Sequence, residues 1–128
     1  MKKRILLIED DLATIELYKT FLNKADFSVE TIRWGEEAIK KIDRIRRRED
    51  EKPNLVLLDL ILPDINGIKV LEEIRRHKET EDLPVFILTN YSDAQLEKMG
   101  RNLRSERYIL KTDYTPKQFI KIIKEKLK

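Results

Sequence analysis

Acidic groups, a hydroxyl and an ammonium group stand directly after short apolar runs of this 128-residue chain. The run RILLI precedes the acidic pair Glu9 and Asp10, and the run LVLL precedes Asp59. In the same way VFIL precedes Thr89, and RYIL precedes Lys111. A carboxylate placed next to a buried segment is costly unless its charge is paired or bound to a metal ion. The repetition of this pattern therefore indicates a functional site.

These residue types have a definite chemistry in common. Several carboxylates close together repel one another and need a cation nearby. No histidine or cysteine accompanies Glu9, Asp10 and Asp59, and an all-oxygen set of ligands favours a hard ion such as Mg²⁺. The ammonium group of Lys111 can neutralise a transferred phosphoryl group as a point charge. Asp10, Thr89 and Lys111 each have a simpler explanation, as a helix cap, a strand residue and a surface lysine, whereas Asp59 at the end of a buried strand is harder to explain in this way. The prediction depends on the coincidence of these residues at the strand ends.

Hydrophobic periodicity predicts the elements that position these groups. Strands are expected at residues 4–9, 27–32, 55–59, 85–89 and 107–110. Helices are expected at residues 12–24, 34–50, about 67–77, 93–99 and from 116 onward. Asp11, either Ser92 or Asp93, and Thr115 are the expected N-caps, and Gly100 is expected to end the fourth helix. Strands alternating with helices predict an α/β fold with a parallel sheet covered on both faces, whose functional crevice lies at the carboxyl ends of the strands.

Composition narrows the class of protein. The apolar fraction of 41% is typical of a globular chain, and no apolar run approaches the length of a membrane span. The basic N-terminus is followed by too few apolar residues for a signal peptide. Because the chain contains no cysteine, disulfides are excluded and a cytoplasmic location is expected. We expect one domain, residues 1–128, without linkers or repeats.

An arginine-rich stretch is the most strongly charged part of a chain whose net charge is only +3. Arg44, Arg46, Arg47 and Arg48 crowd the end of the second expected helix. They suit either a solvated helix end, where cations favour the helix dipole, or a nucleic-acid patch. The first interpretation is preferred because no aromatic interleaving or DNA-binding motif accompanies the arginines.

The sequence closely resembles the receiver domain of response regulators from two-component signalling. The matching segments are ILLIEDD, LVLLDLILPDINGIKVLEEIR, PVFILTNYSD and YILK, which occur in the family's order. The resemblance implies a flavodoxin-like (βα)5 receiver fold with strand order 2-1-3-4-5. It also implies a cytoplasmic signalling phosphoacceptor, which is not an enzyme acting on other substrates and catalyses only its own phosphorylation and dephosphorylation.

The resemblance assigns a role to each residue that matches the family pattern. Asp59 matches the nucleophile that takes a phosphoryl group from a histidine kinase or phosphotransfer protein. Glu9 and Asp10 match the acidic pair that binds Mg²⁺, and Asp59 and the backbone carbonyl of Ile61 complete the protein ligands.

Three further residues match the parts of a receiver that respond to the phosphoryl group. Lys111 matches the lysine that pairs with the carboxylate and then with a phosphoryl oxygen. Thr89 matches the switch hydroxyl, and Tyr108 matches the aromatic that changes rotamer. The implied output face comprises residues 93–99, residues 107–110 and the last helix, and it docks a downstream target protein. Neither direct nucleic-acid contact nor membrane contact is expected.

Some positions depart from the family pattern. Thr112 replaces the proline that usually follows the lysine, so the Lys111–Thr112 peptide bond is either trans or forced cis by the fold. Asn90 and Tyr91 are bulkier than usual after the switch hydroxyl, which predicts slow loss of the phosphoryl group. The second helix is expected to extend further than in a typical receiver.

Other functions fit the residues less well. A haloacid-dehalogenase-type phosphatase needs an aspartate where Ile61 stands, and Glu9, Asp10 and Asp11 would repel the phosphate of a flavin mononucleotide. A degenerate receiver that binds partners without phosphorylation would be expected to lack an acidic residue or Lys111. A receiver cut from a larger DNA-binding regulator stays open as an alternative.

Overall fold

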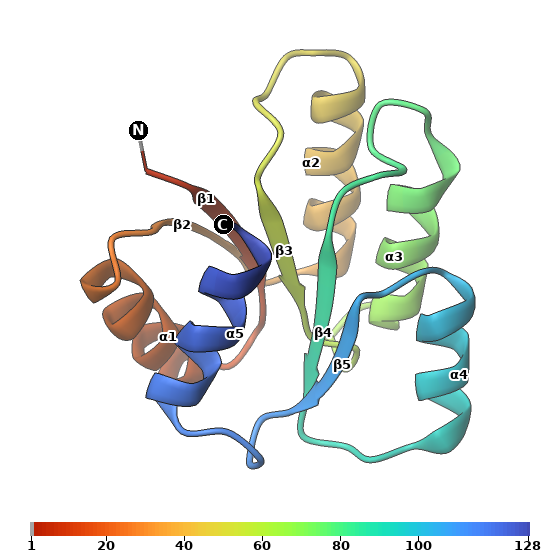
Figure 1. Ribbon diagram of the computed structural model, residues 1–128. Helices are drawn as coiled ribbons and strands as arrows, with labels where there is room; N and C mark the ends of the chain where they lie inside the picture. Colours follow the sequence, from red (N-terminus) through yellow and green to blue (C-terminus); the bar gives the residue numbers. More distant parts are fainter. Residues whose placement is uncertain (1) are drawn as a thin grey trace.

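Strands and helices alternate through residues 2–128, the part of the chain that the computed structural model describes (Figure 1). The strands are β1 (Arg4–Ile8), β2 (Ser28–Ile32), β3 (Leu55–Leu58), β4 (Val85–Thr89) and β5 (Arg107–Leu110). The helices are α1 (Leu12–Lys24), α2 (Gly35–Arg46), α3 (Gly67–Arg76), α4 (Ala94–Asn102) and α5 (Pro116–Lys126). Each predicted element is therefore present, within a few residues of its expected bounds.

The five strands form one parallel sheet in the order β2-β1-β3-β4-β5. β1 and β3 are neighbours, with Ile8 paired to Leu58, and Thr89 at the end of β4 is paired to Leu110. β2 lies on one side of β1 and β3 lies on the other, so the strand order reverses between β1 and β3. Such a switch point opens a crevice at the carboxyl ends of the strands. The predicted fold class and strand order are confirmed.

Side chains of the inner strands alternate between two apolar layers, because successive residues of a strand point to opposite faces. Helices α1 and α5 cover one face, and α2, α3 and α4 cover the other (Figure 1). In β3, Leu55 and Leu57 face α1 and α5, whereas Val56 and Leu58 face the opposite layer. Burial on both faces explains why the inner strands are almost uninterrupted apolar runs. It also leaves the strand ends as the places where polar side chains can emerge.

The predicted caps are present at three helices. The Asp11 carboxylate accepts a hydrogen bond from the backbone N–H of Thr14 at 2.9 Å, and Asp93 accepts from two N–H groups of α4. Thr115 caps α5 in a capping box with Gln118, directly before Pro116. These caps satisfy amide groups that have no partner within their helix.

Two predicted helix ends were wrong. Helix α2 ends at Arg46 rather than near residue 50, because the chain turns with Arg48 in the left-handed region at φ 64°. Gly100 does not end the fourth helix but lies buried inside α4, which continues to Asn102. A Cβ on Gly100 would lie 2.6 Å from Cδ1 of Ile87, so this glycine allows α4 to approach the sheet.

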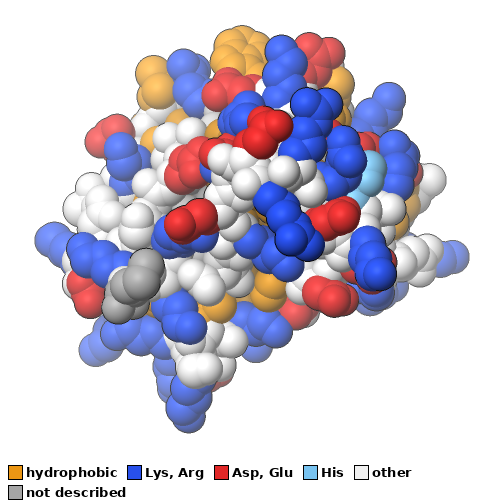
Figure 2. All heavy atoms as spheres, turned by 90° about the horizontal axis from the view of Figure 1, so that it is seen from above, with side chains coloured by type: hydrophobic (Ala, Val, Ile, Leu, Met, Phe, Trp, Pro, Cys, Tyr) orange, Lys and Arg blue, Asp and Glu red, His pale blue; other side chains and the backbone are white. Residues whose placement is uncertain are grey.

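Intramolecular ion pairs occupy most of the arginine-rich stretch. Arg46 and Arg47 both contact the carboxylate of Asp43, at 2.6 and 3.0 Å, and Arg44 contacts Asp50 at 2.7 Å. Figure 2, which views the molecule from the end that carries the α2–β3 loop, shows acidic and basic side chains intermixed over this face. The arrangement is that of a solvated helix end with its own counter-charges.

Replacing Gly67 with alanine is expected to destabilise the fold by about 1–3 kcal/mol, the usual cost of overpacking. A Cβ at this position would lie 2.4 Å from the backbone oxygen of Asp59 and 2.7 Å from Cα of Leu60, neither of which can move aside. Gly100→Ala is the matched control, because the atom closest to its Cβ is Cδ1 at the end of the Ile87 side chain, which can shift further than backbone atoms. Urea unfolding of both variants measures the difference, and equal stability losses would contradict the argument.

Candidate functional site

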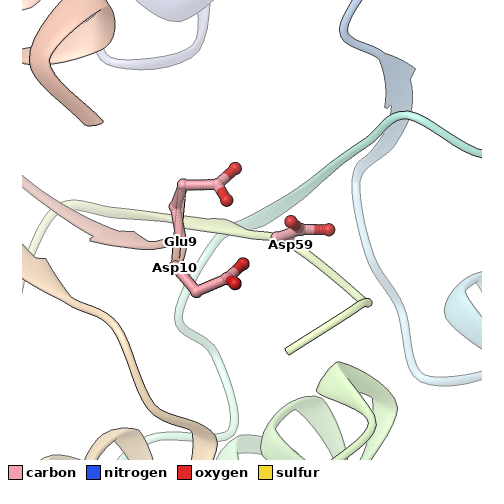
Figure 3. A group of neighbouring side chains, drawn as sticks. All are labelled: Glu9, Asp10 and Asp59. Atoms are coloured by element: carbon pink, nitrogen blue, oxygen red, sulfur yellow. The ribbon is translucent and has the colours of Figure 1, made fainter. Parts of the chain in front are cut away.

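Three carboxylates meet at the carboxyl edge of the sheet, where β1 and β3 end. Glu9 and Asp10 follow β1, and Asp59 follows β3 (Figure 3). The backbone N–H of Asp59 donates to the carbonyl of Ile8 at 3.0 Å, which fixes the two strand ends to each other. One oxygen from each carboxylate lies within 4.8 Å of the others. The sheet therefore brings together the acidic residues that the sequence singled out.

Lys111 supplies the positive charge of this cluster. It follows β5, and its Nζ contacts the Glu9 carboxylate and donates to Oδ2 of Asp59 at 3.3 Å. The side chains of Lys111 and Asp59 are each only 9% exposed, and that of Glu9 is 2% exposed. A single buried cation is thus shared by two buried carboxylates, with Asp10 beside them. The sequence predicted the contact to Asp59 but not the contact to Glu9.

Burial raises the pKa of Glu9 above its ordinary value of 4.5. Hydrogen bonds from Lys111 and from the backbone N–H of Asp11 act in the opposite direction, and the charge of Asp59 adds to the rise. The Glu9 carboxylate is therefore held in a setting that disfavours its negative charge. A divalent cation at this cluster would relieve that penalty.

In the absence of divalent metal, the free energy of unfolding of Glu9→Gln, measured relative to that of the unmodified chain, is expected to increase as the pH rises from 4.5 to 8. The folded chain holds the Glu9 proton more tightly than the unfolded chain does, so ionisation of Glu9 at higher pH reduces stability. Glutamine does not ionise and escapes this loss. Thermal unfolding of both chains across this pH range is the measurement, and a stability difference that stays constant with pH would contradict the assignment.

The set of donors fits a hard divalent cation. Glu9, Asp10 and Asp59 offer oxygen atoms alone, which suits Mg²⁺ more than a softer metal. Three carboxylates with one lysine also leave the cluster with excess negative charge when all are ionised. The same loop that carries Asp59 brings Ile61 next to it, because the Ile61 N–H donates to Oδ1 of Asp59 at 3.1 Å.

Thr89 lies on β4 and Tyr108 on the adjacent strand β5, and both side chains hydrogen-bond to the backbone of Tyr91 in the β4–α4 loop. Thr89 is buried, and its hydroxyl accepts from the backbone N–H of Tyr91 at 3.3 Å. The Tyr108 hydroxyl donates to the backbone oxygen of the same Tyr91 at 2.8 Å. Lys111 joins this group, because its backbone N–H donates to the carbonyl of Thr89 at 2.8 Å.

The chain after Lys111 continues through ordinary peptide bonds. Residues 2–128 contain no cis peptide bond, so the bond from Lys111 to Thr112 is trans.

Tyr18 is a residue near the cluster that the sequence identified only as core. It lies on the buried face of α1, and its ring packs against Phe21 and Phe119. Burial raises its pKa to about 12, with further contributions from the charges of Glu9 and Asp59. Helical periodicity predicts its burial, but nothing in the sequence indicates that the charges of Glu9 and Asp59 contribute to the raised pKa of its hydroxyl.

Comparison with known families identifies the class of protein. The family model described as "Response regulator receiver domain" matches residues 5–124. The chain belongs to the response regulator receiver domain family. It is the receiver domain of a two-component response regulator.

Curated relatives are about one third identical to this chain over the aligned region. The alkaline phosphatase synthesis transcriptional regulatory protein PhoP of Bacillus subtilis is 31% identical over 92% of this chain and 45% of its own length. A transcriptional regulatory protein CpxR homolog of Haemophilus influenzae is 34% identical over 91% of this chain and 44% of its own length. The chain thus spans about half the length of the curated relatives it matches.

Solved structures of response regulators superpose closely on this fold. A CheY-like receiver domain protein from Methanospirillum hungatei has a TM-score of 0.86 and 31% identity, covering 99% of this chain and 94% of its own. The phosphorylated cyanobacterial phytochrome response regulator RcpA has a TM-score of 0.82 and 30% identity, covering 98% and 91%. The Mn²⁺-bound form of response regulator Rcp1 has a TM-score of 0.81 and 28% identity, covering 96% and 90%.

Within residues 2–128, none of the helices has the length and apolar character needed to span a membrane.

Proposed function

We propose that Asp59 is the phosphoacceptor of this receiver domain and that its donor is a phosphohistidine on a histidine kinase or phosphotransfer protein. A carboxylate oxygen of Asp59 attacks the phosphorus atom, an O–P bond forms, and the P–N bond to the histidine breaks. The released imidazole nitrogen keeps the electron pair of that bond. The product is an aspartyl phosphate, which water later hydrolyses to restore the carboxylate. The domain in this proposal promotes only these two reactions on itself.

The contact of one buried lysine with two buried carboxylates is the observation that carries this proposal. Lys111 Nζ lies 3.3 Å from Asp59 Oδ2 and also contacts Glu9. An ammonium group in this position can follow the charge that develops on the phosphoryl oxygens during transfer. The Ile61 N–H, 3.1 Å from Oδ1 of Asp59, orients the carboxylate.

Glu9, Asp10, Asp59 and the backbone carbonyl of Ile61 are the residues that would hold Mg²⁺. When bound, the ion would offset negative charge on the phosphoryl oxygens. The support from this chain is the close grouping of three carboxylate oxygens within 4.8 Å. The Mn²⁺-bound form of the structural neighbour Rcp1 supports, by analogy, the binding of a divalent cation to this chain.

Thr89 and Tyr108 are proposed to transmit the phosphorylated state. A phosphoryl group adds about −2 charge and new acceptor oxygens at Asp59, which attract the Thr89 hydroxyl and Lys111. Movement of that hydroxyl would remove the acceptor of the Tyr91 N–H, and the carbonyl of Tyr91 is the acceptor for Tyr108. The two contacts therefore couple the site to the β4–α4 loop, and phosphorylation shifts the populations of two loop arrangements.

The face formed by α4, β5 and α5 is proposed to dock a downstream protein. It contains Tyr108 and begins at the loop that Tyr91 occupies, so it is the surface nearest to the transmitting residues. We propose that residues 1–128 act as one receiver unit, that its output is protein docking rather than direct contact with nucleic acid or membrane, and that it operates in the cytoplasm.

Incubation with acetyl phosphate, a small phosphoryl donor, tests the proposal. With Mg²⁺ present, intact-mass measurement is expected to show a gain of one phosphoryl group, and chelation of the metal with EDTA is expected to abolish that gain. No gain under either condition would contradict phosphoacceptor function and would favour a receiver that binds partners without phosphorylation.

A further inference from the structure

Helix α2 receives its N-terminal cap from a distant loop. Among the helices of residues 2–128, the other four are capped by the side chain of the residue directly before them. The residue before α2 is Trp34, which makes no such hydrogen bond. Instead Asp64 accepts from the backbone N–H of Gly35 at 2.8 Å through one oxygen and from that of Glu36 at 2.9 Å through the other. Both carboxylate oxygens of Asp64 therefore accept hydrogen bonds from the first turn of α2.

The first residue of α2 is Gly35, which has no side chain to block this contact. A Cβ on Gly35 would lie 2.2 Å from Cγ1 of Ile65 and 3.3 Å from Oδ1 of Asp64. Only a glycine lets residues 64 and 65 approach the helix this closely. The contact is therefore a packed interface, with a carboxylate on the positive end of a helix.

Asp64 belongs to the loop that carries the proposed metal ligand. This loop, residues 60–66, runs from Asp59 to α3, and its two ends are joined. Ile61 and Asn66 form an isolated antiparallel bridge, and the N–H of Gly67 donates to the carbonyl of Leu60 at 2.8 Å. Backbone contacts thus close the loop at its ends, and Asp64 connects the closed loop to α2.

We propose that Asp64 is a positioning residue for divalent-metal binding: its carboxylate, hydrogen-bonded to the first turn of α2, holds the 60–66 loop so that the carbonyl of Ile61 faces the Glu9–Asp10–Asp59 cluster. The inference rests on the proposed function, since that function names the Ile61 carbonyl as a ligand. Groups that orient metal ligands without touching the metal commonly change its affinity by about 10–100-fold when removed.

Titration of Mg²⁺ into the metal-free protein by isothermal calorimetry tests this role. Asp64→Ala is expected to weaken Mg²⁺ affinity about tenfold. Asp64→Asn, which keeps one acceptor oxygen, is expected to lose less. Thr115→Ala is the matched control: it removes the N-cap of α5, which is outside the loop, and is expected to change Mg²⁺ affinity less than twofold. Thermal unfolding of each variant in EDTA records the loss of stability that comes from removing a cap.

The results of these titrations distinguish the positioning role of Asp64 from the proposed phosphoacceptor function. Mg²⁺ affinity that falls in the Asp64 variants, but not in Thr115→Ala at a similar loss of stability, supports the positioning role. Unchanged affinity in Asp64→Asn and Asp64→Ala would overturn that role and leave the proposed function intact. Should Asp64→Ala fail to fold, Asp64→Asn alone decides. Absence of Mg²⁺ binding by the unmodified chain would overturn the proposed function, and the positioning role with it.

Discussion

Asp59→Asn is expected to abolish phosphorylation by acetyl phosphate while leaving the fold intact. Asparagine preserves the size of the side chain and an oxygen that can accept from the Ile61 N–H, which lies 3.1 Å from Oδ1 of Asp59. It lacks the negative charge and nucleophilicity of the carboxylate. Intact-mass measurement in the presence of Mg²⁺ should therefore show no phosphoryl group on the variant under conditions that label the unmodified chain fully.

A second aspartate provides the control for this experiment. Asp26 has a φ of 71°, in the left-handed region that asparagine tolerates well, and its side chain is 82% exposed. Asp26→Asn should be phosphorylated like the unmodified chain. Labelling of Asp59→Asn at an undiminished rate would show that another carboxylate is the acceptor.

Lys111→Met is expected to separate metal binding from phosphoryl transfer. Removal of the ammonium group leaves the buried carboxylates of Glu9 and Asp59 without their shared cation. The metal-free chain should lose about 3 kcal/mol of stability, as when one partner of a buried ion pair is removed. Mg²⁺ affinity should be equal or higher, because the cluster becomes more negative. Phosphorylation should slow about 100-fold, because no cation remains to follow the phosphoryl charge.

The contrast between two measurements makes this prediction specific. Calorimetric titration gives the Mg²⁺ affinity, and the rate of mass gain with acetyl phosphate at saturating Mg²⁺ gives the reactivity. Lys126→Met, which removes an exposed ion pair with Glu106, serves as the control and should change neither quantity. If Lys111→Met lowered Mg²⁺ affinity as strongly as it lowered the rate, Lys111 would act in holding the cluster together rather than in transfer.

The parts of the fold that could be predicted are those that the sequence encodes locally. Apolar runs specify the strands, the caps Asp11 and Thr115 mark two helix starts, and the strand–helix alternation specifies the parallel sheet. The end of α2 could not be predicted in this way. Its apolar periodicity stops at Ile45, but the polar residues beyond it are equally compatible with helix or turn, and Arg48 adopts a left-handed conformation that arginine does not signal.

The candidate site was predictable to the extent that it lies at strand ends. Glu9, Asp10, Asp59 and Lys111 each follow an apolar run, and parallel strands necessarily bring such residues to one edge. The contact between Lys111 and Glu9 was missed because it joins residues 102 positions apart. The Asp64 cap was missed for the same reason: the side chain serves a helix 28 residues earlier in the chain. Long-range hydrogen bonds of this kind leave no periodic pattern in the sequence.

Direct location of the phosphoryl group is the most decisive measurement for this protein. After incubation with acetyl phosphate and Mg²⁺, reduction with borohydride converts an aspartyl phosphate to homoserine, which tandem mass spectrometry can locate. We predict homoserine at position 59 and at no other carboxylate. Homoserine at position 10, or its absence from a chain that has gained a phosphoryl group, would contradict the assignment of Asp59 as the phosphoacceptor.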